Sequence, residues 1–178
     1  MKVLSLGMDA VANLKPKIKP FLRGHFHQAA FFFSLGACLL LLTRAHEYYS
    51  VISAIVYSFS LCGLFGVSAL YHRMHWKQEK IRDRIGRVDH SFIFILIAGT
   101  SMPVCLLTLS PEQATKILTI IWIAALIGIF QALFFAAPKW VSAILYVFVG
   151  WLAVPYLPEF RAALGPVQGS FLLAGGII

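Results

Sequence analysis

Charged residues are scarce in this chain: Asp, Glu, Lys and Arg make up 12% of its 178 residues, whereas 60% are hydrophobic. A soluble domain usually carries about 25% charged residues, so the composition argues against an ordinary aqueous globule. Acidic residues are scarcer than basic ones, seven against fifteen, which leaves a net charge of +8. The basic residues lie between long apolar runs and form no continuous basic stripe interleaved with aromatics, so no nucleic-acid partner is expected.

Cysteine is also sparse, and Cys38, Cys62 and Cys105 all fall inside apolar runs without CxxC spacing. This pattern argues against a disulfide framework or a cysteine-based metal site and indicates small, buried side chains. Regular alternation of polar and apolar residues is missing from the same runs, which excludes the strands of a membrane barrel.

Long apolar runs are what the chain has instead, and five of them are long enough to cross a bilayer as helices. A helix needs about 20 residues, with a range near 17–25, to cross roughly 30 Å of hydrocarbon. The sequence therefore predicts an all-α, polytopic transmembrane helical bundle. The predicted spans cover about residues 26–43, 48–72, 89–109, 117–136 and 140–155.

The basic residues predict how the bundle is oriented. With the N-terminus in the cytoplasm, twelve of the fifteen Lys and Arg residues fall in cytoplasmic segments, and only Arg44, Lys116 and Arg161 fall outside. Cytoplasmic loops carry the excess of Lys and Arg in membrane proteins. Residues 1–20 are therefore predicted to be a basic cytoplasmic segment, and residues 21–178 a transmembrane domain.

The last ten residues resemble the first half of another span. Residues 169–178 are mostly apolar, and as a helix they would rise only about 15 Å. A terminal carboxylate would then lie near the centre of the bilayer, where an ionised group is strongly disfavoured. We therefore expect a transmembrane domain that is incomplete at its C-terminus and truncated within a sixth helix.

Polar residues gather where the second and third predicted spans meet the cytoplasmic face. Ser68 and His72 are four residues apart and so share one face of a helix, and Asp89 opens the third span. Residues 73–88, between them, form a predicted loop with six basic residues. Ionisable groups at the mouths of spans are costly and usually functional, and His with Asp can bind a metal and activate water.

Structural roles remain open for the same residues. His72 could be an interfacial histidine at a helix end, with Ser68 bonded to its own turn. Asp89 could cap the third span, since a helix N-terminus favours a carboxylate. Three nearby histidines are assigned interfacial or packing roles, although the first two could reach the same site: His25, His27 and His90.

Four short motifs, taken in order, resemble those of a known family. They occur at the ends of the expected spans, and the resemblance covers about residues 20–178. The chain resembles the hemolysin III branch of the progestin and adipoQ receptor superfamily. The motifs are Arg23-Gly24-x-x-His27, Ser68-x-x-x-His72, Asp89-His90-x-x-Ile93 and Ala98-Gly99-Thr100-x-x-Pro103.

The resemblance implies a seven-helix protein of the bacterial inner membrane with a zinc site that faces the cytoplasm. In that family a histidine at the end of the second helix holds the metal, and this histidine matches His72. Two further histidines come from the start of a seventh helix, which this sequence does not contain. Ser68 and Asp89 match the residues that support the site and its bound water. The family resembles alkaline ceramidases, so Zn²⁺-dependent hydrolysis of a lipid amide is the implied activity.

Because only His72 matches a metal ligand, the chain itself is expected to bind zinc poorly, and whether it is an enzyme stays open. The alternative is a non-enzymatic membrane protein that senses or regulates the lipid state of the membrane, or that perturbs membranes as a hemolysin. Few charges lie within the spans to carry an ion path, so a transporter is the weaker interpretation. The expected partners are the lipid bilayer and a lipid substrate or ligand, and the sequence predicts no oligomeric state.

Overall fold

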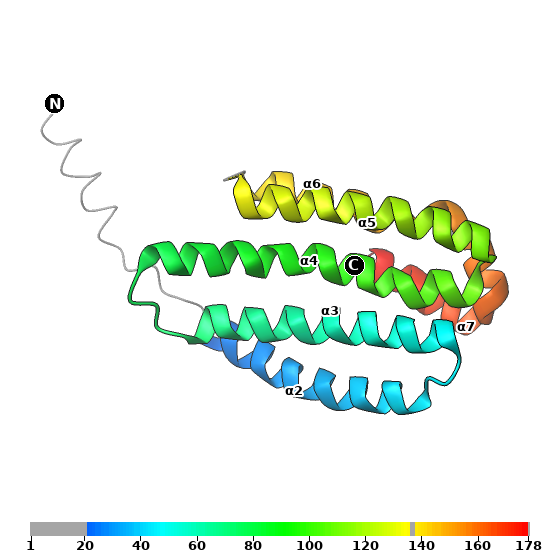
Figure 1. The fold of residues 1–178 in the computed structure, drawn as a ribbon, viewed down its shortest axis with the longest axis horizontal. Coiled ribbons are helices and arrows are strands. Elements are labelled where there is room, and N and C mark those ends of the chain that lie inside the picture. The colour runs from blue at the N-terminus through cyan, green and yellow to red at the C-terminus, as the bar shows by residue number, and fades with distance from the viewer. Residues whose placement is uncertain (1–20, 136–137, 178) are drawn as a thin grey trace, which may run out of the picture.

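The structure, a computed structural model, describes residues 21–135 and 138–177 (Figure 1). These residues form helices and contain no strand, so the predicted all-α bundle is confirmed. The elements in chain order are α2 (Phe21–Arg44), α3 (Tyr48–Arg73), α4 (Glu79–Thr108), α5 (Pro111–Phe134), α6 (Lys139–Trp151), the 3₁₀ turn η1 (Val154–Tyr156) and α7 (Leu157–Ile177).

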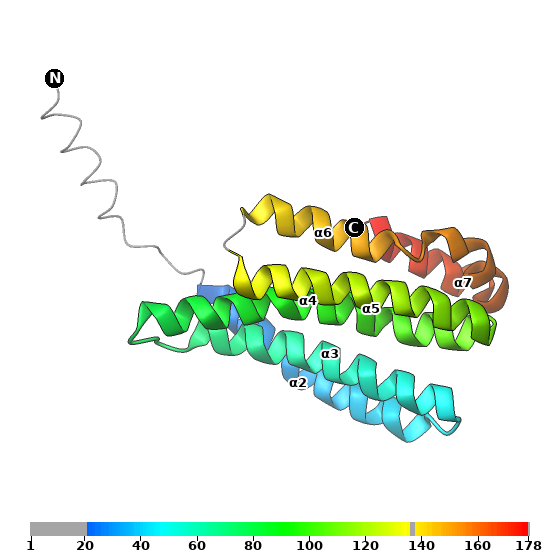
Figure 2. The same ribbon diagram turned by 45° about the horizontal axis from the view of Figure 1, so that its top comes forward.

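Helix α4 lies at the centre of the assembly. It packs against α3, α5, α6 and α7, whereas α2 packs mainly against α3 (Figure 1). Helix α6 lies beside α4 and α5 (Figure 2). Helix α7 reaches one end of the bundle and then turns back, and the break lies at Gly165, whose φ of 81° is a conformation that glycine adopts without strain.

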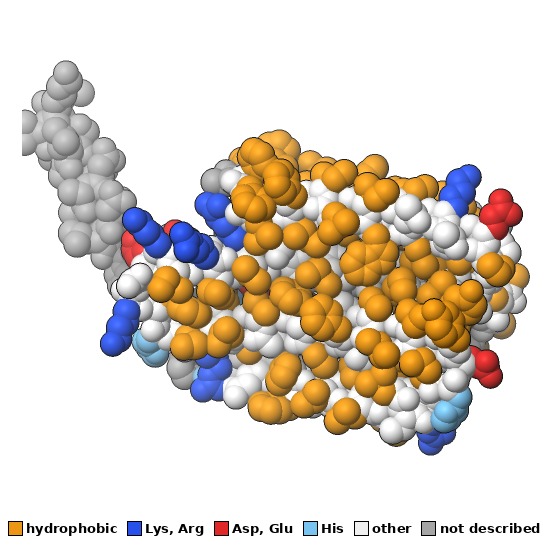
Figure 3. All heavy atoms as spheres, in the orientation of Figure 1, with side chains coloured by type: hydrophobic (Ala, Val, Ile, Leu, Met, Phe, Trp, Pro, Cys, Tyr) orange, Lys and Arg blue, Asp and Glu red, His pale blue; other side chains and the backbone are white. Residues whose placement is uncertain are grey.

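Many apolar side chains lie on the face of the bundle that Figure 3 shows. Phe33 is 80% exposed and Phe171 is 75% exposed, whereas soluble monomers rarely expose large apolar patches. Such a surface suits contact with lipid chains, and the fold is that of an integral, multi-pass membrane protein. Five segments are long and apolar enough to cross a membrane: Gly24–Arg44, Tyr48–Arg73, Glu79–Thr108, Pro111–Phe134 and Trp140–Leu172.

Glycines let the helices approach closely inside the bundle. A Cβ at Gly128 of α5 would lie within 2.6 Å of three ring atoms of Phe94, which is fully buried on α4. Gly99 of α4 faces α3 in the same way, because its Cβ would lie 2.7 Å from the Cβ of Ser60. Membrane helices gain little from the hydrophobic effect, so close packing of this kind contributes much of their association.

Helix α4 begins ten residues before the predicted start of the third span. Helix α4 begins at Glu79, so most of the predicted basic loop is helical and only 74–78 connect α3 to α4. Ile81 and Ile85 recur at helical spacing between the charged residues, which explains the longer helix. Asp89 therefore lies about three turns into α4 and does not cap it.

Other helix bounds also differ from the predicted ones. Helix α5 begins at Pro111, six residues early, because Ser110 and Gln113 form a capping box in which the Ser110 side chain accepts from the Gln113 amide at 3.4 Å. Helix α6 ends at Trp151, four residues before the predicted end of the fifth span. The predicted N-terminal segment 1–20 lies outside the described residues.

Candidate functional site

A cavity of about 470 Å³ lies between α2, α3 and α4, at the end of the bundle that holds the α3–α4 turn. Polar groups from all three helices line it. Because polar groups are costly at the depth of a membrane span, such a gathering indicates function more often than packing. The polar lining residues are His27 of α2, Ser68, Tyr71 and His72 of α3, and Asp89 and His90 of α4.

Ser68 is paired with His27 across the α2–α3 interface. Ser68 Oγ lies 2.7 Å from His27 Nδ1, and Ser68 is only 6% exposed. The hydroxyls of Ser60 and Ser91 donate to carbonyls of their own helices, but Ser68 makes no such bond among the described residues. The two side chains therefore share one hydrogen bond across the α2–α3 interface, and the tautomer of the His27 ring sets which of them donates.

Gly24 lets α2 approach α3 closely enough for this pairing. A Cβ at Gly24 would lie 2.9 Å from Arg73 Cγ and 3.2 Å from the Cβ of His72. His27 follows three residues later on the same face of α2, and its ring centroid is 5.9 Å from that of His72. The glycine of this motif makes room for the contact, and the histidine enters the cavity.

Helix α4 contributes Asp89 and His90 from the opposite wall. His90 Nδ1 donates to the carbonyl of Gly86 at 2.7 Å, and the Tyr146 hydroxyl of α6 donates to the carbonyl of His90 at 3.0 Å. When the His90 ring is neutral, its lone pair is therefore on Nε2. The Asp89 carboxylate makes no hydrogen bond or ion pair with any described residue.

The predicted site residues Ser68, His72 and Asp89 thus line one cavity, although their chemical roles stay predictions. The structure excludes the alternative in which Ser68 bonds to its own turn. His27 joins the three, whereas the sequence favoured an interfacial role for it. The signal that could have placed His27 was the glycine three residues earlier, which marks a close approach of two helices.

The donor types of the cavity suit zinc, but their placement does not complete a zinc site. A catalytic zinc takes three protein ligands and keeps one position open. No group of three or more His, Cys, Asp or Glu side chains is placed to hold a metal ion in the part of the chain that the structure describes. The described residues alone therefore do not supply the ligand set that the resemblance implies.

Comparison with known proteins shows which protein family the chain is similar to. The model of the family described as "Haemolysin-III related" matches residues 16–178. Hemolysin-3 of Bacillus cereus is 33% identical over 150 residues, which cover 82% of this chain and 67% of the relative. The Hemolysin-3 homolog of Bacillus subtilis (strain 168) is 31% identical over 156 residues, which cover 85% of this chain and 72% of the relative. No solved structure was found to match the chain.

Proposed function

The chain belongs to the haemolysin-III related family, and on this premise we propose that it is a zinc-dependent membrane hydrolase of lipid amides. The observation that carries the proposal is the cavity that Ser68, His72 and Asp89 line together. Hydroxyl, imidazole and carboxylate groups are the ones that hydrolysis of an amide needs, as proton donors, metal ligands and bases. Their presence within an otherwise apolar bundle supports a chemical role.

The walls of the cavity support a lipid as the substrate. Leu64, Phe65 and Ile93 form its apolar part, next to the polar groups. A volume of about 470 Å³ suits the polar part of a lipid, with its acyl chains outside in the bilayer. The amide would then lie among the polar groups, near the end of the bundle, where the head groups of lipids are found.

Within this proposal His72 would be a zinc ligand, the Ser68 hydroxyl would orient a water molecule, and the Asp89 carboxylate would accept a proton from that water. Zinc would supply a polarised carbonyl and a more acidic water at neutral pH. The described residues do not complete a three-ligand group, so binding needs further donors or a rearrangement of the cavity. Two more imidazoles, those of His27 and His90, line the same space.

Zinc content and amide hydrolysis test the proposal in the purified protein. We expect little zinc in the chain by itself, because the described residues lack a three-ligand set. In a chain extended by a helix that carries two further histidines, we expect bound zinc and cleavage of a ceramide in nanodiscs, and the loss of both in His72→Ala. His75→Ala is the matched control, because His75 is an exposed histidine in the α3–α4 turn that does not line the cavity. Zinc that is unchanged in His72→Ala, or ceramide cleavage that survives His72→Ala with Asp89→Ala, would overturn the proposal.

We also propose that the cavity faces the cytoplasm, in a bacterial inner membrane. The support is the uneven distribution of Lys and Arg, most of which belong to segments at the cavity end. Lys80 at that end and Lys116 at the other are exposed and suit single-cysteine labelling in a cysteine-free background. A membrane-impermeant maleimide added to intact spheroplasts should label Lys116→Cys and spare Lys80→Cys, and the reverse pattern would contradict the orientation.

A second candidate function, perturbation of membranes, is favoured by the names of the two relatives, Hemolysin-3 and the Hemolysin-3 homolog. Release of a trapped dye from vesicles by the purified protein tests it. Release that is equal for the wild type and His72→Ala would favour this candidate, because it would not need the cavity.

A further inference from the structure

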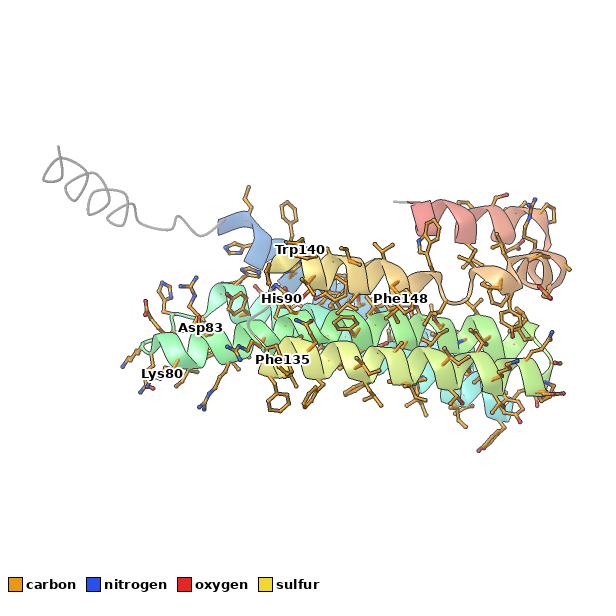
Figure 4. All side chains as sticks on the ribbon, turned by 90° about the horizontal axis from the view of Figure 1, so that it is seen from above. Lys80, Asp83, His90, Phe135, Trp140 and Phe148 are labelled. Carbon is orange, nitrogen blue, oxygen red and sulfur yellow. The ribbon has the colours of Figure 1, made fainter. Side chains whose placement is uncertain are left out.

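The start of α4 carries basic residues that the proposed hydrolase does not use. Helix α4 projects beyond the neighbouring ends of α3, α5 and α6 (Figures 1 and 4), so its first turns extend past the part of the bundle that is covered by exposed apolar side chains. Lys80, Arg84 and Arg87 lie there at positions i, i+4 and i+7 and share one face of the helix. These three residues are called the basic stripe below.

The charges of the stripe are not neutralised by neighbouring residues. Lys80 and Arg84 are exposed and make no hydrogen bond or ion pair with any described residue. Glu79 and Asp83 lie on the same turns but form no ion pair with them. Since residues 73–88 hold six Lys and Arg against two acidic residues, the segment keeps a strong positive charge.

Arg87 joins the stripe to the neighbouring helix. Its Nη1 donates to the carbonyl of Leu133 near the end of α5, at 3.0 Å. This bond holds one edge of the guanidinium against α5, while the side chain stays exposed and has further N–H donors. The stripe therefore has one anchored cation and two unpaired ones, all within reach of a group that approaches α4 from outside.

We propose that the basic stripe binds the phosphate of an anionic phospholipid. Residues four apart on a helix have Cβ atoms about 5–6 Å apart, so Lys80 and Arg84 can reach the same phosphate. An exposed apolar side chain follows on the α5 side, where Arg87 is bonded: Phe135, which comes directly after α5, is 59% exposed (Figure 4). A lipid therefore meets cations for its head group and an apolar surface for its chains.

Charge complementarity selects the head group. Basic residues next to a membrane attract anionic lipids by about 1 kcal/mol each, which corresponds to roughly a fivefold change in affinity per residue. A purely diffuse attraction would depend only on the number of charges. A specific site depends also on which face of the helix carries the charges. Substitutions that remove equal charge from different faces therefore distinguish a specific site from diffuse attraction.

Two pairs of substitutions with equal charge make this separation. Lys80→Gln with Arg84→Gln removes two charges from the stripe, and Lys77→Gln with Arg82→Gln removes two from the same segment but from other positions. We expect the dissociation constant for short-chain phosphatidylglycerol, titrated into the detergent-solubilised full chain, to rise about 30-fold in the first pair. It should rise less than about threefold in the second pair, and the wild type should bind phosphatidylcholine far more weakly.

Three results would overturn the proposal. Equal losses in the two pairs would show diffuse attraction without a site. Equal affinity of the wild type for phosphatidylglycerol and phosphatidylcholine would show that the phosphate charge is not recognised. Inorganic phosphate that binds as tightly as phosphatidylglycerol would assign the stripe to a soluble anion. None of these measurements involves zinc or hydrolysis, so the outcome is independent of the proposed activity.

Discussion

Replacement of Gly128 by alanine should destabilise the bundle, although alanine is the better helix former. The added Cβ would lie within 2.6 Å of three atoms of the Phe94 ring. That ring is fully buried and has Tyr146 of α6 beside it, with the ring centroids 4.5 Å apart. Because the Phe94 ring has no open space to enter, α4 and α5 must move apart or the ring must leave its preferred rotamer.

The magnitude follows from two opposing contributions. Overpacking of a well-packed core typically costs about 1–3 kcal/mol, and exchange of glycine for alanine inside a helix contributes about 0.5–1 kcal/mol of stability. Gly128→Ala should therefore lower the free energy of unfolding by up to about 2.5 kcal/mol, and its stability should lie about 1–3 kcal/mol below that of a glycine-to-alanine exchange without the close contact. Gly150→Ala is the matched control, because nothing lies within 4 Å of its Cβ, and it should leave stability unchanged or raise it by up to about 1 kcal/mol.

Reversible unfolding in mixed micelles measures both variants under the same conditions. Phe94→Leu combined with Gly128→Ala tests the cause, since a smaller side chain relieves the contact and the two changes should couple by about 1 kcal/mol or more. If Gly128→Ala were as stable as Gly150→Ala, the close approach of α4 and α5 would be refuted.

Three further substitutions test other contacts, with the free energy of unfolding in the same micelles as the measurement. His27→Leu should lower the free energy of unfolding by about 1–3 kcal/mol because it leaves the buried Ser68 hydroxyl without its partner. His27→Asn keeps a hydrogen-bonding group near the Nδ1 position and should lose less, so equal losses would contradict the hydrogen bond. Ser110→Ala should cost about 1 kcal/mol through loss of the α5 cap, and Ser110→Asp should restore it. Gly24→Ala should be less stable than Gly36→Ala. A Cβ at Gly24 would lie 2.9 Å from Arg73 Cγ on α3, whereas a Cβ at Gly36 has nothing within 4 Å.

The sequence predicted helices best where apolar runs and helix bounds coincide. The apolar run predicts the second span at 48–72, and α3 covers Tyr48–Arg73. The two agree because charged residues border the run closely at both ends. The start of α4 differs from the predicted one because a hydropathy pattern detects the part of a helix that lies in the bilayer and does not detect a polar extension of that helix. Charged residues from Glu79 onward are compatible with a helix, and Ile81 and Ile85 mark its continuing face.

The pairing of Ser68 with His27 could not be predicted from periodicity. Periodicity within α3 places Ser68 and His72 on one face, and the sequence predicts this part of the site. Which residue of α2 meets that face depends on the register between two helices, and no single helix contains that information. The contact at Gly24 fixes the register, so a glycine in the first turns of a span was the available evidence.

The position of Asp89 in α4 bears directly on its role. The structural alternative relied on a helix N-terminus, whose favourable effect on a carboxylate is confined to the first turn. Asp89 lies about three turns further along, lines the cavity and makes no hydrogen bond or ion pair with a described residue. A carboxylate in this setting costs free energy, so Asp89→Asn should leave the free energy of unfolding unchanged or raise it, while any lipid-amide hydrolysis is lost. Unfolding in micelles measures this change. If Asp89→Asn lowered the free energy of unfolding by more than about 1 kcal/mol, Asp89 would be a structural residue, because removal of an unpaired charge should not destabilise the fold.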